Sequence, residues 1–387
     1  MDTTLTAKPK LPGAAQTASE IATELAPEFA SMAAGHDAAD SFVADNFQRL
    51  RDAGLLEISV PTELGGGGAT IADLCDMLRI IARACGSTAL SFAMHTHQVA
   101  IPAWRWHHAP PAKAAVEPLL KRVAAERLFL LSSGGADWVG GSGTAQKVDG
   151  GYRITARKSI ISGAPTGNLL VTGAVSNEEG GPFVVHFAAP MKTPEIRILD
   201  TWHTLGMRGT GSHDIQIDDL FIPDDKIALK RKAGEWHPVF QIIGTIAFPL
   251  IYAVYLGVAE SARDIALGLA TKRAPNARAA RLAGQMDTTL RAAQLAHRSM
   301  VEAAECNAPS ETTINDVMIG RRLVEENAIR TVELAMELAG GAGFYRDAGL
   351  ERRFRDVQGA RYHPMTRDAQ YEYTGSLALG LPVSNVF

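Results

Sequence analysis

The hydrophobic pattern of this chain changes period twice along its length, and that change constrains the fold more than any other feature. From about residue 18 to 127, apolar residues recur at every third or fourth position, as in FQRLRDAGLLEISV, which predicts helices. Between about 128 and 229, short alternating runs such as PFVVHFAAP are separated by turn residues, which predicts the strands of a small β-barrel or sandwich. From about 238 onward the helical spacing returns in long segments, which predicts a bundle.

This order predicts an α+β fold in three parts. We expect an N-terminal all-helical domain over residues 1–127, a central β-barrel domain over 128–229 and a C-terminal four-helix bundle over 230–387. Asp149-Gly150-Gly151 predicts a hairpin turn, because glycine adopts the positive φ that such turns need. Ser310 is a predicted N-cap, and the helix that it starts is expected to stop at Gly340-Gly341.

One apolar stretch, residues 239–259, is long enough to cross a bilayer. Gln241, Thr245 and Pro249 interrupt it, and amphipathic helical sequence follows directly. We therefore expect a helix that is buried on all sides in the bundle rather than a membrane span.

Charge and cysteine content exclude several classes of function. The net charge of -4 supplies no basic field, so neither a nucleic acid nor an anionic membrane is an expected partner. The three cysteines form no Cys/His pattern, so no metal site is expected. The N-terminus lacks the pattern of a secretory signal, which favours a cytoplasmic location. Neither G-x-G-x-x-G nor a P-loop motif occurs, so electrons from NAD(P)H would arrive through a separate reductase.

Three segments, in the right order, resemble the acyl-CoA dehydrogenase superfamily. They are LRDAGLLEISVPTELGGGGATIADLCDMLRIIARACGSTAL, WHTLGMRGTGSHDIQIDDLFIP and AMELAGGAGFYRDAGLERRFRD. The resemblance implies a flavin between the β-domain and the bundle, with the ADP portion of FAD reaching across a dimer interface. It also implies a homo-oligomer, commonly a dimer of dimers.

The positions of the family's catalytic base distinguish between reactions. An acyl-CoA dehydrogenase needs a carboxylate that takes the α-proton of its substrate. In many members this base lies nine residues after the arginine of an Arg-Asp pair, and counting from Arg355-Asp356 that position holds Pro364. A similar stretch, YEYT at 371–374, places Glu372 eight residues too late. The other familiar position, in IIGTIAFPLIYAVY, has no carboxylate.

Other segments are closer to the flavin monooxygenases of this superfamily, such as dibenzothiophene monooxygenase and the two-component aromatic hydroxylases. His363 stands beside the expected base position, and Ser162-Gly163 replaces the Thr-Asn-Gly of dehydrogenases. The family's Thr-Glu-Pro-Gly-Ala-Gly-Ser-Asp segment is replaced by SSGGADW at 132–138. The leading hypothesis is therefore a monooxygenase that works through a flavin C4a-(hydro)peroxide, with reduced flavin supplied by a separate reductase.

Hydroxyls and neutral imidazoles are suitable donors for such chemistry. The catalytic candidates are His363, Ser162 and one of His95 or His97, since two residues only two positions apart cannot share a helix face. Glu372 is the candidate base if the protein is a dehydrogenase.

The resemblance also implies a set of cofactor contacts. Arg273 stands where the family has an arginine that contacts the FAD pyrophosphate, and Glu337 replaces an expected glutamine, so FAD and FMN both stay open. The full set of cofactor-binding candidates is Ser132, Trp138, Ile161, Ser162, Gly163, Arg273, Glu337, Gly340 and Gly341.

Two other functions stay open at this point. The first is an acyl-CoA dehydrogenase with a displaced base, which would oxidise an acyl thioester. The second is a non-catalytic protein that has kept the fold and lost flavin chemistry. The expected partners are a small-molecule substrate, a flavin reductase and further copies of the chain.

Overall fold

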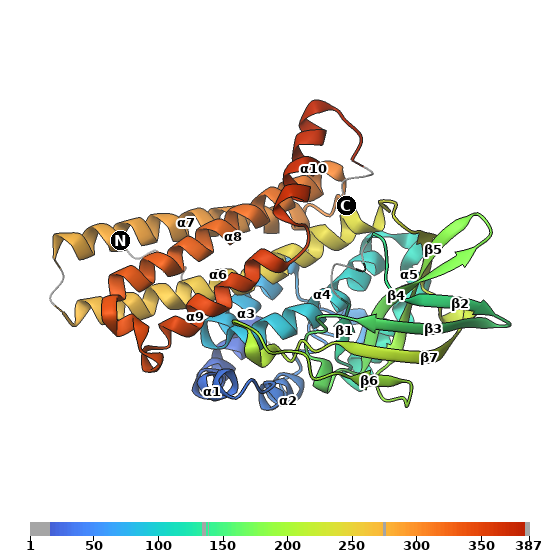
Figure 1. Cartoon of the computed structure of the whole chain (residues 1–387), viewed down its shortest axis with the longest axis horizontal. Helices are drawn as coiled ribbons and strands as arrows, with labels where there is room; N and C mark the ends of the chain where they lie inside the picture. The colour runs from blue at the N-terminus through green and yellow to red at the C-terminus, as the bar shows by residue number, and fades with distance from the viewer. Residues whose placement is uncertain (1–15, 134–136, 138, 274–275, 384–387) are drawn as a thin grey trace.

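The computed structural model describes residues 16–133, 137, 139–273 and 276–383. Figure 1 shows the long helices of the bundle side by side, with α1 to α4 beneath them and the β-sheet at one end. The order of helices, strands and helices predicted from the periodicity is confirmed. The boundary expected at residue 229 falls on the first residue of the last strand, so the sheet extends to Lys232.

The first part of the chain is helical because its apolar residues lie on one face of each helix. Thr70 starts the third helix with a capping box, in which its hydroxyl accepts from the Asp73 amide and the Asp73 carboxylate accepts in return. The fourth helix is buried along most of its length, so it lies at the centre of the molecule. The helices are α1 (Ala18–Ala38), α2 (Ala44–Asp52), α3 (Ile71–Ala84), α4 (Gly86–His108) and α5 (Lys113–Glu126).

The described strands form one eight-stranded sheet in the order β6-β7-β3-β2-β4-β5-β8, with β1 paired to β4. The predicted hairpin joins β2 to β3, and Gly150 in its turn has a φ of 74°. The pairings found within the described residues do not join β6 to β8, so the sheet has two edges and is not a closed barrel. The strands are β1 (Leu130–Ser132), β2 (Thr144–Val148), β3 (Gly151–Lys158), β4 (Leu169–Glu178), β5 (Gly181–Pro190), β6 (Ile196–Ile198), β7 (Ile215–Pro223) and β8 (Leu229–Lys232).

The bundle is built around α6, the helix that contains the apolar stretch. Of the described helices, α6 is the one apolar and long enough to span a membrane, and 89% of its most apolar window is buried inside the protein. The expectation of a buried core helix is confirmed. Ser310 caps α8 and Gly340 ends it, as predicted. The helices are α6 (Val239–Thr271), α7 (Ala277–Glu305), α8 (Glu311–Ala339), α9 (Leu350–Val357) and α10 (Arg367–Leu379).

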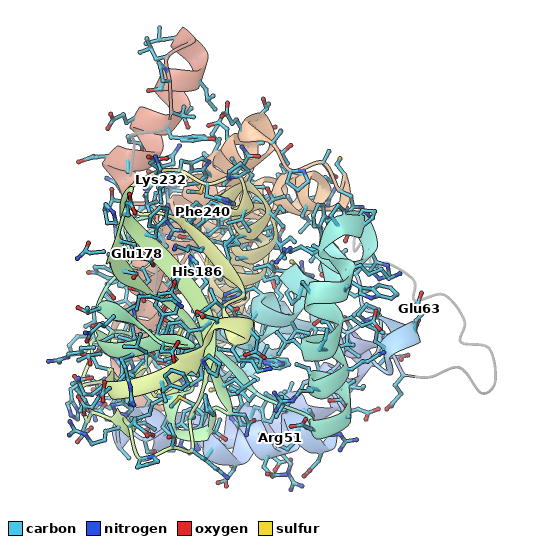
Figure 2. The ribbon with its side chains drawn as sticks, turned by 90° about the vertical axis from the view of Figure 1, so that its right-hand side faces the viewer. Arg51, Glu63, Glu178, His186, Lys232 and Phe240 are labelled. Atoms are coloured by element: carbon cyan, nitrogen blue, oxygen red, sulfur yellow. The ribbon has the colours of Figure 1, made fainter. Side chains whose placement is uncertain are left out.

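Where α6 begins, the bundle meets the sheet. Figure 2 labels Phe240 at this start of α6 together with His186 and Lys232 of the sheet. The buried Arg231 guanidinium lies 4.8 Å from the Phe240 ring and donates from Nε to His186 at 3.0 Å. This contact fixes the end of the sheet against the bundle.

The Arg355-Asp356 pair of α9 joins all three parts of the chain. Arg355 forms an ion pair with Asp37 of α1 and donates to the Leu205 carbonyl. Asp356 accepts from the Met207 amide at 2.6 Å. The segment after β6 is thereby held against both helical parts, which positions the residues described next.

Candidate active site

His363 is held in place by three side chains of the bundle core. It follows the short helix η9 (Gln358–Tyr362). Tyr252 donates to the Ala360 carbonyl at 2.8 Å, and Arg321 Nη2 donates to the His363 carbonyl at 2.7 Å. The Tyr255 hydroxyl lies 2.6 Å from His363 Nε2. The ring is therefore preorganised, although part of the residue stays accessible.

The pair formed by Tyr255 and His363 is electrically neutral. Burial, together with the nearby positive charge of Arg321, lowers the pKa of His363 to about 3. Burial also raises the pKa of Tyr255 well above its ordinary value. At neutral pH one proton is consequently shared between a neutral imidazole and a neutral phenol.

The structure separates the two histidines of α4. His97 Nδ1 donates to the Ala93 carbonyl at 3.0 Å, and its Nε2 lies 3.2 Å from the Gln98 amide. Burial lowers the pKa of His97 to about 4, and this residue lies near enough to act on the pKa of His363. Both imidazoles are therefore neutral at neutral pH.

His95 has a different place. Its Nε2 donates to the Leu56 carbonyl at 2.8 Å, and its Nδ1 accepts from the Leu130 amide at 3.0 Å. Both ring nitrogens are engaged by backbone, so His95 joins α4 to β1 and has no nitrogen left for catalysis. We leave it out of the candidate site.

Ser162 ends a chain of buried hydroxyls whose direction can be worked out. Thr210 Oγ1 donates to the Met207 carbonyl at 2.9 Å, so the Ser212 hydroxyl, 2.7 Å away, must donate to Thr210. Ser162 Oγ lies 2.8 Å from Ser212 Oγ and must donate to it for the same reason. Because each hydroxyl has one proton, the oxygen of Ser162 is left as an acceptor.

The residues around Ser162 are shaped by close packing. Gly163 has a φ of +78°, and a Cβ there would lie 2.5 Å from the Phe129 ring. Ile161 is fully buried, and its amide donates to the His213 carbonyl at 3.1 Å. Neither residue can change without moving Ser162. The side chain of Ile161 is therefore part of the core, and a ligand would meet only its backbone.

A buried ion pair ties the segment after β1 to the strand that leads to Ser162. Lys158 is completely buried and lies 3.0 Å from the Asp137 carboxylate. Its ammonium also donates to the carbonyls of Ser142, at 2.8 Å, and Gly173, at 2.6 Å. Ser132, a predicted cofactor contact, ends β1 just before this segment and is partly exposed. Trp138, another, lies outside the described residues.

The other predicted cofactor contacts lie where α6 and α8 end, at the end of the bundle away from the sheet (Figure 1). Arg273 donates to the Ala339 carbonyl, and Gly340, with a φ of +57°, ends α8 beside it. Glu337 is exposed and lies 3.6 Å from Arg330, and Gly341 is exposed as well. Between Tyr255 and the end of α6 the helix rises roughly 25 Å. One ring system cannot contact both groups within a single chain.

Glu372, the candidate base, lies on the surface of the protein. It is exposed on α10, while its neighbour Tyr373 is the residue that turns inward. An exposed carboxylate is not desolvated or held by the bundle core, so the structure gives no support to Glu372 as the base of the dehydrogenase hypothesis.

Sequence reasoning missed the charged residues beneath His363. Arg321, Arg322 and Glu325 of α8 are 0%, 5% and 1% exposed. A signal was available, because Arg321 falls on the apolar stripe of α8 between Val317 and Val324. Tyr255 was also missed, because a tyrosine within an apolar helix is expected to be a core residue.

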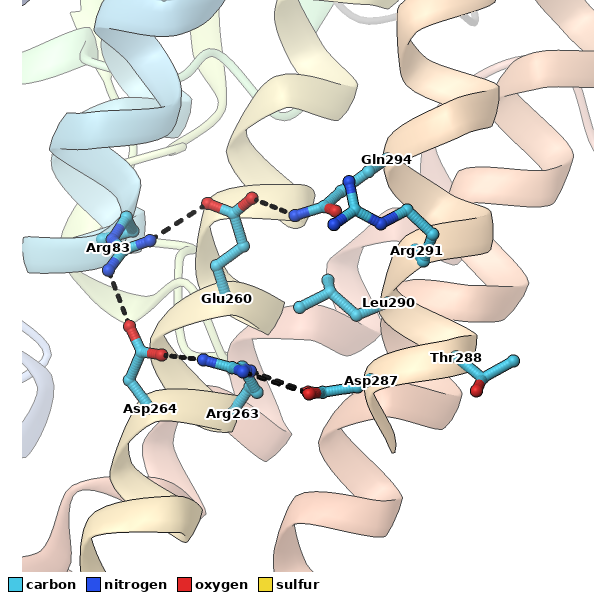
Figure 3. Close-up of a pocket in the computed structure, with 9 residues that line it drawn as sticks. All are labelled: Arg83, Glu260, Arg263, Asp264, Asp287, Thr288, Leu290, Arg291 and Gln294. Atoms are coloured by element: carbon cyan, nitrogen blue, oxygen red, sulfur yellow. Dashed lines mark hydrogen bonds and ion pairs between the residues drawn. The ribbon is translucent and has the colours of Figure 1, made fainter. Parts of the chain in front are cut away.

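A separate cavity of about 540 Å³ opens between α3, α6 and α7 (Figure 3). Its charged walls are largely paired with one another. Arg83 contacts Glu260 and Asp264, and Arg263 contacts Asp264 and Asp287. This network joins the N-terminal helices to the bundle, and the cavity is lined by none of the residues around His363 or Ser162.

Comparison with known proteins agrees with this architecture. Family models described as the N-terminal, middle and C-terminal domains of acyl-CoA dehydrogenase match residues 14–108, 132–220 and 250–368. An L-evernosamine nitrososynthase from Micromonospora is 27% identical over 96% of this chain and 92% of its own length. Relatives described as acyl-CoA dehydrogenases match as well.

Two further matches carry a flavin in their descriptions. HsaA, the oxygenase subunit of a flavin-dependent monooxygenase from Rhodococcus jostii, is 26% identical over 88% of this chain and 92% of its own length. The solved structure of KijD3 in complex with FMN and a dTDP-linked amino sugar is 28% identical, with a TM-score of 0.87 and 96% of both chains covered.

Proposed function

We propose that this protein, which belongs to the acyl-CoA dehydrogenase family, acts as a flavin-dependent monooxygenase on a small organic substrate. The observation that carries the proposal is the neutral pair of Tyr255 and His363, which lies 2.6 Å apart in a buried setting. Abstraction of an α-proton from an acyl thioester needs a carboxylate or an equally strong base. His363, whose pKa burial lowers to about 3, is a weaker base than an ordinary carboxylate.

The residues present fit a flavin. Ser162 is 7% exposed, and its oxygen keeps acceptor capacity that its neighbours do not use. An N–H group of a flavin ring is a suitable donor to that oxygen. Gly163 adds no side chain beside it, and the Lys158–Asp137 pair holds the adjacent segment. When bound, the reduced flavin supplies the two electrons that activate dioxygen.

The protein's own residues then have separate roles. Ser162 orients the flavin ring through the acceptor oxygen. His363 either donates from Nε2 to the Tyr255 oxygen or accepts there from the Tyr255 hydroxyl, so it can serve as donor or acceptor without carrying net charge. His97 adds a second neutral imidazole on the α4 side. Tyr252 and Arg321 keep His363 in place and exclude water behind it.

Several finer points belong to the same proposal. Reduced flavin comes from a separate reductase, and FMN is favoured because KijD3 binds it. Arg273, Glu337, Gly340 and Gly341 lie at the end of α6 and α8, roughly 25 Å along α6 from Tyr255, so they would not contact the same flavin ring as His363. If FAD is used, these residues contact its ADP portion from a second copy in a homo-oligomer, in the manner of a dimer of dimers. The protein works in the cytoplasm.

The proposal is tested by supplying electrons and dioxygen. Purified protein is loaded with FMN or FAD, reduced by a flavin reductase with NADH, and mixed with oxygenated buffer. We expect bound flavin to be reoxidised more slowly than free flavin, with delayed release of hydrogen peroxide. Protein that binds no flavin, or that leaves reoxidation at the rate of free flavin, would contradict the proposal.

A further inference from the structure

The core of the bundle contains more positive charge than its own residues neutralise. Arg321 and Arg322 bring two guanidinium groups into the interior, and Glu325 brings one carboxylate. Arg322 Nη1 lies 2.6 Å from Glu325 Oε1, whereas Arg321 Nη2 lies 3.8 Å from Glu325 Oε2. Among the described residues, these are the ion pairs that the two arginines make. The cluster therefore has a net charge of +1.

Aromatic rings surround the two guanidinium groups. Arg321 lies 5.2 Å from the Tyr252 ring and 5.8 Å from the Phe248 ring, both on α6. Arg322 lies 5.7 Å from the Tyr371 ring on α10. Aromatic faces stabilise a cation, but they do not accept the hydrogen bonds that point along the plane of a guanidinium group.

Several polar atoms of the cluster have no hydrogen-bond partner within the described part of the chain. They are Nε and Nη1 of Arg321, Nε of Arg322 and Oε2 of Glu325. The same holds for Thr245 Oγ1 and Gln370 Oε1. Thr245 lies one helical turn before Phe248, and Gln370 directly precedes Tyr371, so both belong to the helices that cover the cluster.

Unmet donors of this kind are costly. A buried donor without a partner costs about 1–3 kcal/mol, and an uncompensated buried charge costs several kcal/mol more. Water can satisfy the hydrogen bonds but cannot neutralise the charge. An oxyanion satisfies both, because it accepts several hydrogen bonds and carries the missing negative charge.

The cluster is connected directly to the candidate active site. Arg321 is the same residue that donates to the His363 carbonyl at 2.7 Å. A ligand group bound by Arg321 would therefore lie within one side chain of His363. This is the arrangement expected of a subsite that anchors one end of a substrate while the other end reacts.

We propose that Arg321, Arg322 and Glu325 form an oxyanion subsite, and that the substrate carries a carboxylate or phosphate group which binds there. This inference rests on the proposed function, since it treats His363 as part of the active site. It assigns a substrate class, the small organic acids and phosphate esters, rather than neutral molecules.

Binding can be measured without catalysis. The flavin-loaded protein is titrated in a calorimeter with benzoate, with phenyl phosphate and with the neutral analogue benzamide. We expect at least one of the two anions to bind at least tenfold more tightly than benzamide. Preference for benzoate or for phenyl phosphate identifies which oxyanion the subsite takes. Equal affinity for all three, or no binding of either anion, would overturn the proposal.

Substitutions assign the effect to the cluster. Arg321→Met should abolish the preference for the anion. Arg353→Met is the control, because it removes another arginine of the bundle, one that donates to the Gly349 carbonyl. It should leave the preference unchanged. Glu325→Gln keeps the shape and removes a carboxylate that competes for Arg321 and Arg322, so affinity for whichever anion the unaltered protein prefers should rise at least threefold. This second variant tests the idea even if Arg321→Met fails to fold. Unchanged or weaker binding in Glu325→Gln would contradict it.

The outcome is separable from the fate of the proposed function. Anion binding that depends on Arg321, in a protein that fails the dioxygen test, would retain the subsite and remove the monooxygenase. Slow flavin reoxidation in a protein that shows no preference for anions would retain the monooxygenase and remove the subsite.

Discussion

At the scale of single residues, the account depends on the hydrogen bond between Tyr255 and His363. Both side chains lie in an environment that disfavours charge, so each stays neutral and one proton makes the hydrogen bond between them. The sequence predicts His363 as a site residue because it stands beside the family's base position. It could not reveal Tyr255 as its partner, because 108 positions separate them and only packing brings them together.

Removal of the Tyr255 hydroxyl tests this pair. Tyr255→Phe keeps the ring and leaves His363 Nε2 without its partner, which forfeits a bond of about 1 kcal/mol. We expect release of hydrogen peroxide from the reduced, flavin-loaded protein to change by about threefold to tenfold, since 1.4 kcal/mol corresponds to tenfold. The measurement is a peroxide assay after mixing with dioxygen.

Tyr373→Phe is the matched control, because it deletes another buried tyrosine hydroxyl of the bundle, one that donates to the Glu311 carbonyl at 3.3 Å. Equal peroxide release in both variants and the unaltered protein would remove Tyr255 from the site.

Asp356 predicts a pH dependence of stability with a definite sign. Burial raises its pKa to about 6, although the Met207 amide acts in the opposite direction. An unfolded aspartate has a pKa of about 3.9, so the folded protein binds the proton more tightly. The stabilisation is present below about pH 4 and is lost as the pH rises through 6, by about 3 kcal/mol in all.

Asp356→Asn removes this titration and keeps an oxygen that accepts from Met207. We expect the free energy of unfolding of the variant, relative to the unaltered protein, to increase by about 2–3 kcal/mol between pH 4 and 7. Urea unfolding at several pH values measures it. A difference that does not depend on pH would show that Asp356 is not desolvated as described.

At the scale of elements, the sequence predicted most of what local chemistry decides. The cap at Ser310, the end of α8 at Gly340 and the hairpin at Gly150 are all confirmed, because each depends on residues close together in the chain. The pairing order of the sheet was not predictable. Periodicity tells which residues share a face but not which partner covers that face.

The ion pair between Lys158 and Asp137 joins two elements, β3 and the segment after β1. Lys158→Met should leave the Asp137 carboxylate buried and unpaired, which costs about 3–5 kcal/mol. The double variant Lys158→Met with Asp137→Asn should recover at least half of that loss. Urea unfolding of both single variants and the double variant measures the coupling.

Flavin affinity supplies a second measurement on the same single and double variants of Lys158 and Asp137. We expect it to fall in Lys158→Met and to recover in parallel with stability. Additive losses in the double variant would show that the two residues act independently.

At the scale of the whole molecule, buried histidines set the response to acid. Burial lowers the pKa of each to about 3 or 4, while an unfolded histidine has a pKa near 6.5. Their stabilisation is present above pH 6.5 and is lost as the pH falls toward 4. The residues concerned are His95, His97, His186, His297 and His363.

We therefore expect the chain to unfold between about pH 6.5 and 4. By pH 5, each buried histidine lowers the free energy of unfolding by up to about 2 kcal/mol. The sum over five histidines is comparable with the whole stability of a typical domain. Protonation of Asp356 offsets only about 3 kcal/mol of this. Circular dichroism across the pH range measures the transition, and a protein that stays fully folded at pH 4 would contradict the burial of these rings.

We propose that this member of the acyl-CoA dehydrogenase family lacks the base for dehydrogenation. Anaerobic mixing of the oxidised, flavin-loaded protein with a panel of acyl-CoA thioesters tests it most directly, with the visible absorbance of the flavin as the readout. We predict that the oxidised-flavin band persists with every thioester and falls only when a flavin reductase and NADH are added. Bleaching by any acyl-CoA alone would show that a base is present, and would return the protein to the dehydrogenases.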